Sequence, residues 1–115
     1  MPLKPIKLKD RLDQIKKDPR EVLNFCRYTL KSTRWPGAEP FILKNKDPFW
    51  ALMYARDVIQ GRWPEAEPLI MKDSFLAYRY AKEVIKGPWQ EAERFIKRDA
   101  AAWSLYSDKV LLHKM

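Results

Sequence analysis

The 115-residue sequence has little of several features that whole protein classes need. It holds one cysteine, Cys26, and one histidine, His113, so it offers neither an internal disulfide nor the usual four-ligand zinc site. Only three glycines accompany nine prolines, and valine and threonine are scarce, which argues against a strand-rich sandwich. No apolar run approaches the roughly 18 residues of a membrane-spanning helix. Residues 1–10 lack the apolar stretch of a signal peptide, so we expect a soluble, cytoplasmic protein that binds no membrane.

The charge of the chain is high and unevenly spread. The formal net charge is +8. Residues 1–34 contain ten Lys or Arg against four Asp or Glu, whereas residues 35–115 contain thirteen against eleven. This asymmetry favours an anionic partner, either nucleic acid or an acidic protein surface, without choosing between them.

The dominant positive feature is an internal repeat of about 26 residues. A Trp-Pro block occurs three times, at residues 34–42, 62–70 and 88–96. A basic residue and an aspartate follow each block, and the aspartates Asp47, Asp73 and Asp99 are separated by 26 residues both times. A Tyr-Ala or Tyr-Ser pair and a Val-Ile or Val-Leu pair then follow in register. A weaker copy begins near residue 15, and the half-copy before it has lost the Trp-Pro block, as terminal repeats often do.

The punctuation of each copy predicts two helices. Asp47 precedes Pro48, which places a capping carboxylate before a proline at the first helical position. Apolar residues then recur at spacings of three and four, as on one face of a helix. We expect Gly61 and Gly87 to end this helix in a left-handed conformation. A short second helix then starts at the Trp-Pro block, where glutamates in its first turn complement the helix dipole.

These patterns predict an all-α protein made of tandem helix pairs. We expect one domain over residues 1–115 with about four two-helix repeats, a degenerate first copy and a basic segment at residues 1–17. Helices this short need packing against their neighbours. The copies would therefore stack into a small α-solenoid or a compact helical bundle, two arrangements that the sequence does not separate.

The repeat resembles a known sequence pattern. Residues 62–87 read Trp-Pro-Glu-Ala-Glu, then Ile, Lys-Asp and Tyr-Ala-x-x-Val-Ile-x-Gly, and this resembles a short helical repeat of tailed-bacteriophage and some bacterial proteins. The resemblance covers about residues 15–111. It implies a helical repeat fold and a phage origin, hence a host-cell cytoplasm, but those repeats mostly lack assigned biochemistry and transfer no catalytic residue. Gly37 and Gln90 depart from the glutamate pattern, which argues against a required function for that position.

The sequence holds no constellation that favours catalysis. The pairs Glu65/Glu67 and Glu91/Glu93 lie where the helix dipole explains them, and no His, Ser or Lys recurs beside them. Cys26 shares a column with Ala55 and Ala81, which indicates a packing residue. With no glycine-rich phosphate loop and no metal-ligand spacing, we predict a non-enzymatic protein without a cofactor or a metal.

Aromatic residues offer a second candidate chemistry. Trp35, Trp63 and Trp89 could stack on nucleic-acid bases, but their recurrence before each short helix favours packing between helices. Phe49, Phe75 and Tyr78 are the aromatic residues that the pattern assigns neither to the core nor to the surface.

The basic columns carry the most functional promise. One column is Lys17, Lys46, Lys72 and Arg98; a second is Arg27, Arg56 and Lys82; a third is Arg34 and Arg62. Stacked repeats would align each column into a row that follows a phosphate backbone or an acidic surface. Against this, cations near helix ends also satisfy carbonyls, and an adjacent aspartate offsets the first column. The candidate binding residues are Lys4, Lys7, Lys9, Arg11, Lys16, Lys17, Arg27, Arg34, Arg56 and Arg62.

The sequence therefore predicts an interaction protein. A host or viral protein is the favoured partner, because repeat arrays present extended binding surfaces. Nucleic-acid binding through phosphates, with little sequence specificity, is the alternative. A self-assembling structural component is a third hypothesis.

Overall fold

The structure, a computed structural model, describes residues 8–112, and over this range the all-α prediction is confirmed. Eight α-helices and no strand occur there, joined by short π- or 3₁₀-helical turns. The α-helices are α1 (Leu8–Lys16), α2 (Pro19–Asn24), α3 (Glu39–Lys44), α4 (Pro48–Tyr54), α5 (Glu67–Met71), α6 (Ser74–Tyr80), α7 (Gln90–Ile96) and α8 (Ala100–Tyr106). The turns are η1 (Phe25–Thr29), η2 (Ala55–Ile59), η3 (Pro64–Ala66), η4 (Ala81–Ile85) and η5 (Ser107–Leu111).

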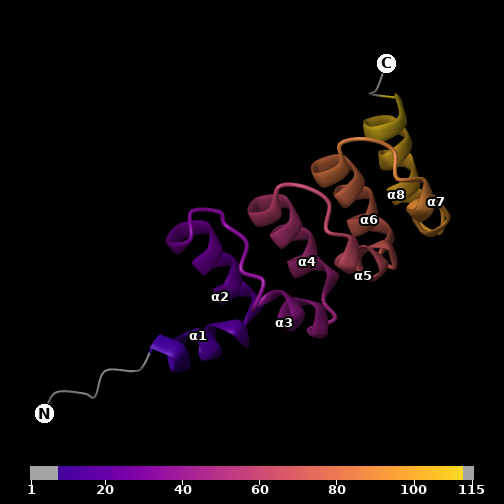
Figure 1. Cartoon of the computed structure of the whole chain (residues 1–115). Coiled ribbons are helices and arrows are strands. Elements are labelled where there is room, and N and C mark those ends of the chain that lie inside the picture. The colour runs from indigo at the N-terminus through magenta and orange to yellow at the C-terminus, as the bar shows by residue number, and fades with distance from the viewer. Residues whose placement is uncertain (1–7, 113–115) are drawn as a thin grey trace, which may run out of the picture.

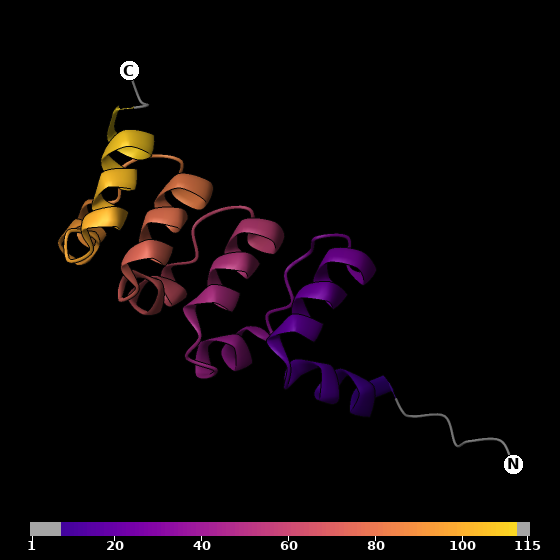
Figure 2. The same cartoon turned by 180° about the vertical axis from the view of Figure 1, so that it is seen from behind.

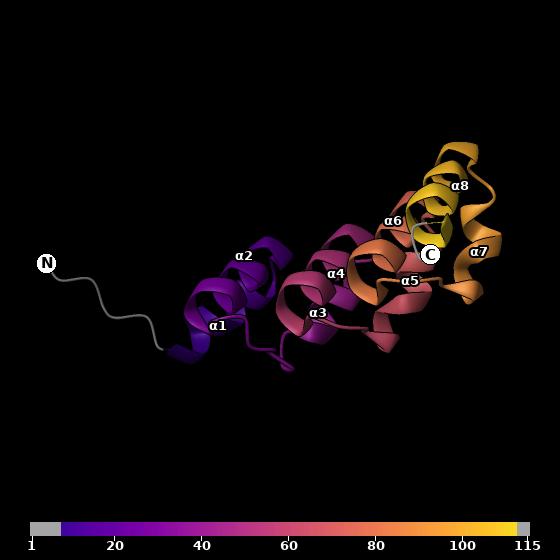
Figure 3. The same ribbon diagram turned by 90° about the horizontal axis from the view of Figure 1, so that it is seen from above.

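The helices form four successive pairs. Pair 1 is α1 with α2/η1, pair 2 is α3 with α4/η2, pair 3 is η3/α5 with α6/η4, and pair 4 is α7 with α8/η5. The second helices α2, α4, α6 and α8 pack side by side in a row, and the first helices lie along one edge of that row (Figures 1 and 2). The pairs follow one another from one end of the molecule to the other (Figure 3). The principal extents are 63 × 24 × 22 Å, so the molecule is elongated.

The predicted aspartate caps are present at the start of the second helix of each pair, that is, of α2, α4, α6 and α8. The side chains of Asp18, Asp47, Asp73 and Asp99 each accept a hydrogen bond from a backbone N–H of the first turn, at 2.9 to 3.0 Å. Each aspartate has an extended backbone, which is the usual geometry of this cap. Each helix then ends in one wider π-helical turn.

The expected role of the glycines at the helix ends is wrong. The left-handed residues are Gln60 and Lys86, with φ of 59° and 61°, each one position before the glycine. No glycine of the described chain has a positive φ, and a Cβ added to Gly61 would meet nothing within 4 Å. The π-helical last turn shifts the reversal one residue earlier than an α-helical end would place it.

The core is a continuous layer of the repeated apolar residues. Trp63 and Trp89 are 1% exposed, and Tyr54, Tyr80 and Tyr106 are fully buried. The structural interpretation of the recurring tryptophans is confirmed for these two, while Trp35 is half-buried. Tyr78 also lies in the core, whereas Phe49 and Phe75 are 37% and 47% exposed.

One side-chain arrangement, which we call the tyrosine clamp, joins the two helices of pairs 2, 3 and 4. In pair 3 the Tyr80 hydroxyl accepts a hydrogen bond from the Trp63 backbone N–H at 2.7 Å and donates one to Glu67 at 2.8 Å. The same bonds join Trp35, Tyr54 and Glu39 in pair 2 and Trp89, Tyr106 and Glu93 in pair 4. The clamp therefore satisfies a backbone donor at the entry to each first helix.

The aromatic rings of the same column also join one pair to the next. The Tyr54 ring lies 5.0 Å from the ring of Trp63, and the Tyr80 ring lies 4.7 Å from that of Trp89, both in tilted geometry. In pair 1 the clamp position is Phe25, which keeps the ring contact, at 4.8 Å from Trp35, but has no hydroxyl. Tyr54 and Tyr80 therefore each contribute to two interfaces, one within their own pair and one with the next pair.

We predict that Tyr80→Phe lowers the free energy of unfolding by about 2 kcal/mol, because it leaves the buried Trp63 N–H without an acceptor. The measurement is chemical denaturation followed by circular dichroism. Tyr78→Phe is the matched control, since within the described residues the buried Tyr78 side chain makes no hydrogen bond. Equal stability losses in the two variants would contradict the role of the clamp.

Candidate interaction surfaces

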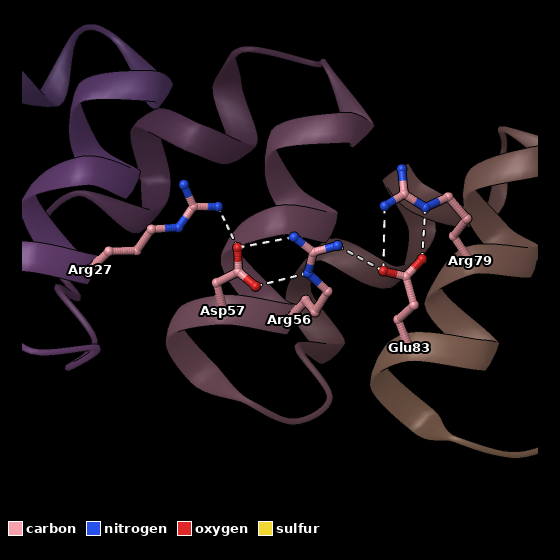
Figure 4. A network of polar contacts seen from close by, with 5 residues as sticks. All are labelled: Arg27, Arg56, Asp57, Arg79 and Glu83. Carbon is pink, nitrogen blue, oxygen red and sulfur yellow. Dashed lines mark hydrogen bonds and ion pairs between the residues drawn. The ribbon is translucent and has the colours of Figure 1, made fainter.

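A charged network, the ion-pair ladder, crosses three of the four pairs (Figure 4). Asp57 of η2 lies between Arg27 of η1 and Arg56, which donates to it from Nε at 2.8 Å. Arg56 also donates to Glu83 of η4 at 2.8 Å, and Arg79 of α6 donates to the same carboxylate at 2.7 Å. Arg27 and Arg56 of the second basic column are thus each paired with a carboxylate of the following pair.

The ladder keeps its carboxylates ionised. Hydrogen bonds from Arg56 and Arg27 hold the pKa of Asp57 below its usual value, although burial opposes this. Burial also raises the pKa of Glu83, but the hydrogen bonds from Arg79 and Arg56 outweigh it and leave the pKa lowered. Lys82, at the third position of this column, is exposed, and the residue facing it by register in pair 4 is Lys109 instead of a carboxylate. The ladder therefore stops before the last pair.

The third basic column belongs to the tyrosine clamp. Arg34 donates two hydrogen bonds of 2.9 Å to Glu39, and Arg62 donates two of 2.8 and 2.9 Å to Glu67. Burial raises the pKa of Glu67, but the bonds from Arg62 and Tyr80 outweigh it, so the pKa is lowered. Sequence reasoning assigned these glutamates to the helix dipole and missed the tyrosine and arginine partners. The one sequence signal for the arginine partner was the Arg-Trp-Pro motif, which two copies share and which is followed in both by a glutamate five residues after the arginine.

The remaining candidate cations lie toward the N-terminal end. Lys4 and Lys7 lie outside the described residues. Lys9, Arg11 and Lys17 are exposed, and Lys16 lies 3.8 Å from Asp13 with its ammonium group 5.6 Å from the centre of the Trp35 ring. The structure thus separates the candidate binding residues into cations with intramolecular partners and cations that face outward.

The first basic column remains open to solvent. Lys17, Lys46, Lys72 and Arg98 are all exposed, and in the part of the chain that the structure describes none of them forms an ion pair. Two exposed aromatic residues, Phe49 and Phe75, follow three positions after Lys46 and Lys72. Cations and aromatic rings therefore lie together on the edge where the second helices begin.

A hollow of about 500 Å³, the end groove, opens at the N-terminal end between α1 and α2/η1. Its apolar residues are Leu12 and Ile15 of α1 and Phe25 and Tyr28 of α2/η1. Arg11 and Glu21 also line it. The Tyr28 side chain is 76% exposed, the largest exposure among the large hydrophobic residues described. No sequence argument singled out this residue.

The opposite end of the molecule is partly covered by its own residues, although Leu112 is 62% exposed there. The Trp103 ring stacks on that of Tyr106 at 5.4 Å. The ammonium group of Lys97 lies 4.9 Å from the centre of the Trp103 ring and covers it. Ser104 and Asp108 are exposed polar residues on the same helix. The two ends therefore differ in kind, because the N-terminal end exposes an aromatic residue beside a groove and the C-terminal end exposes an aliphatic one.

Cys26 is fully buried in the core, as its column predicts. Burial, together with the nearby Glu39 carboxylate, raises the pKa of the thiol to about 11, so the thiol is protonated at neutral pH. Among residues 8–112 no group of three or more His, Cys, Asp or Glu side chains is arranged to hold a metal ion. None of the described helices is both long and apolar enough to cross a bilayer.

Comparison of the chain with protein-family models, with curated proteins and with solved structures finds no significant match.

We predict that Arg56 and Glu83 are coupled by about 0.5 to 1 kcal/mol in a double-mutant cycle with Arg56→Gln and Glu83→Gln. Because the folded-state pKa of Glu83 lies below 4.5, the coupling is present at neutral pH and is lost as the pH falls through that pKa. Chemical denaturation at pH 7, 5 and 3 measures it. Lys82→Gln, at an exposed position, is the control and should change stability by less than about 0.5 kcal/mol. A coupling unchanged at pH 3 would contradict the ionic nature of the ladder.

Proposed function

We propose that this chain is a non-enzymatic interaction protein that binds a host or viral protein. The observation that carries the proposal is the end groove, where Tyr28 is 76% exposed beside Phe25, Leu12 and Ile15. Aromatic side chains that remain in water on a folded protein are typical of binding hot spots, especially where polar residues surround them. Here Arg11 and Glu21 provide that polar surround.

The charge distribution supports a protein partner over a phosphate backbone. Four of the candidate anion-binding residues, Arg27, Arg34, Arg56 and Arg62, are each paired with a carboxylate of this chain. Their charges are largely offset, so a polyanion gains little from them. What remains accessible is an elongated surface with exposed apolar groups, of which Tyr28 at one end is the most exposed, and helical arrays offer surfaces of this kind to proteins.

The test is an affinity capture with the full chain as bait, from a nuclease-treated extract of host cells with and without virus. We expect one discrete protein that rebinds after purification, in a fixed ratio measured by light scattering. A capture that disappears after nuclease treatment would point to a nucleic-acid bridge. Recovery of no protein that rebinds would contradict the proposal.

One observation favours nucleic-acid binding as a second candidate function. Lys17, Lys46, Lys72 and Arg98 form an exposed column with Phe49 and Phe75 nearby. A row of cations with aromatic rings is typical of single-strand binders, in which phosphates and bases are contacted together. The capping aspartate beside each cation weakens this surface, because its negative charge offsets the positive charge of that cation.

We predict for this alternative that Lys46→Glu with Lys72→Glu reduces the slope of log affinity against log salt by about 2 in gel shifts with a single-stranded DNA. Lys82→Glu with Lys86→Glu is the matched control, since it changes the net charge equally at exposed positions on the far ends of the helices. Equal losses in both double variants would indicate attraction by net charge alone. An absence of any shift at about 50 mM salt would exclude the alternative.

A further inference from the structure

The end groove occupies a position that is filled everywhere else in the molecule. In pairs 2, 3 and 4 the second helix has one face that points toward the N-terminal end of the molecule. The second helix of the preceding pair covers that face. The Val58 side chain on that side of η2 is 3% exposed, and Thr29 at the same position of η1 is exposed. Asp57 and Glu83 are 24% exposed, whereas Tyr28 at the same position is 76% exposed. Among residues 8–112, therefore, no helix covers this face of pair 1.

The chain itself shows which kind of helix covers this face. Pair 4 has no following pair, so a comparison with it identifies the positions that face forward. Leu52 is fully buried in pair 2, and Ser104 at the same position of pair 4 is exposed. Ala51 and Ala55 of the same helix are fully buried as well, while Trp103 and Ser107 at their positions in pair 4 remain partly buried. The comparison thus assigns Leu52 to the covering face, with the small Ala51 and Ala55 one and three positions away allowing close approach.

A second copy of the chain does not suit the groove. Stacking the C-terminal end of one copy on the groove of another would bring Ser104, Ser107 and Asp108 against the apolar residues. The transverse extents of 24 × 22 Å limit an end-to-end contact to about 500 Å² per partner, against the roughly 800 Å² of a stable interface. A single helix laid into the groove is not subject to this limit, because it buries its own apolar stripe along its length.

We propose that the end groove binds an amphipathic helix of the partner protein, about three turns long, in the place of a preceding repeat. This rests on the proposed function and specifies its site. The helix carries an apolar stripe of alanine- and leucine-sized residues that packs against Ile15, Phe25 and Tyr28. Its polar flanks face Arg11 and Glu21, the basic and the acidic residue that line the groove, so they carry charges of both signs. The uncharged Tyr28 replaces the ladder carboxylate, so the helix needs no arginine there.

The probe is a capped synthetic peptide of residues 47–61, which contains α4/η2 and covers the equivalent face of pair 3. It is titrated into the isotope-labelled full chain, and backbone NMR shifts are followed. We expect saturable shifts confined to α1 and α2/η1, with helix formation in the peptide. The matched control peptide carries Leu52→Glu in the covering stripe and should bind at least about ten-fold more weakly.

Variants of the full chain test the groove from the other side. Tyr28→Glu should weaken binding of the 47–61 peptide at least about ten-fold, and its exposure means that the fold tolerates the change. Phe75→Glu is the control, because Phe75 is an exposed aromatic residue far from the groove, and it should leave binding unchanged.

Two results would overturn the groove assignment. One is an absence of shifts at millimolar peptide, and the other is equal binding of the wild-type and Leu52→Glu peptides. The failure of the proposed function looks different. A partner that rebinds the Tyr28→Glu chain as well as the wild type leaves the proposed function standing and removes the groove as its site. A chain that binds the peptide but captures no protein contradicts the proposed function alone.

Discussion

The hydrogen bonds of the buried tyrosine hydroxyl are the interaction on which the rest of the structure depends. The Tyr80 hydroxyl accepts a hydrogen bond from the Trp63 N–H and donates one to the Glu67 carboxylate, while the Tyr80 ring packs against Trp89 of the next pair. One residue thus closes its own helix pair and supports the next one. Burial, opposed by the Trp89 N–H and reinforced by Glu93, raises the pKa of the equivalent Tyr106 to about 12, so the neutral hydroxyl persists at any physiological pH. Helices of five to seven residues are too short to persist alone, and in pairs 2, 3 and 4 such a bond helps to hold them together.

The two ends of the molecule show what happens where this column runs out. At the C-terminal end Trp103 stacks on Tyr106, and Lys97 covers the Trp103 ring, so the last tyrosine ring of the column still has an aromatic partner. At the N-terminal end the column begins with Phe25, which has no hydroxyl and is half-buried, and Tyr28 projects beside it. A terminal repeat whose only role was to meet water would carry polar residues at such positions, as pair 4 does with Ser104. The apolar residues retained at the N-terminal end are therefore the ones that a function has to explain.

Local rules made the helices predictable from the sequence, and the limits of those rules mark what was not. Each capping aspartate predicts the start of a helix, because its carboxylate accepts a hydrogen bond from a backbone N–H of the first turn. The sequence predicted the left-handed residue one position too late, at Gly61 instead of Gln60, since nothing in the sequence indicates the π-helical last turn. The clamp was missed because Glu67 and Tyr80 are distant along the chain and meet only after the pair has closed. The candidate surface depends on the same long-range pairing, which no local pattern reveals.

The basic columns show most directly why a count of charges does not locate a binding surface. Arg56 and Lys72 are both basic residues that recur at a fixed position of the sequence repeat. In the fold Arg56 contacts two carboxylates, and hydrogen bonds to Asp57 and Glu83 raise its pKa further, whereas Lys72 stands exposed. A paired guanidinium would have to break its hydrogen bonds to the carboxylates before it could bind a phosphate. The phosphate would then only replace an existing ion pair, so little binding free energy would be gained. The surface open to a partner is thus set by what the array leaves unpaired and uncovered, and among the apolar groups of the described chain that condition is met most fully at Tyr28.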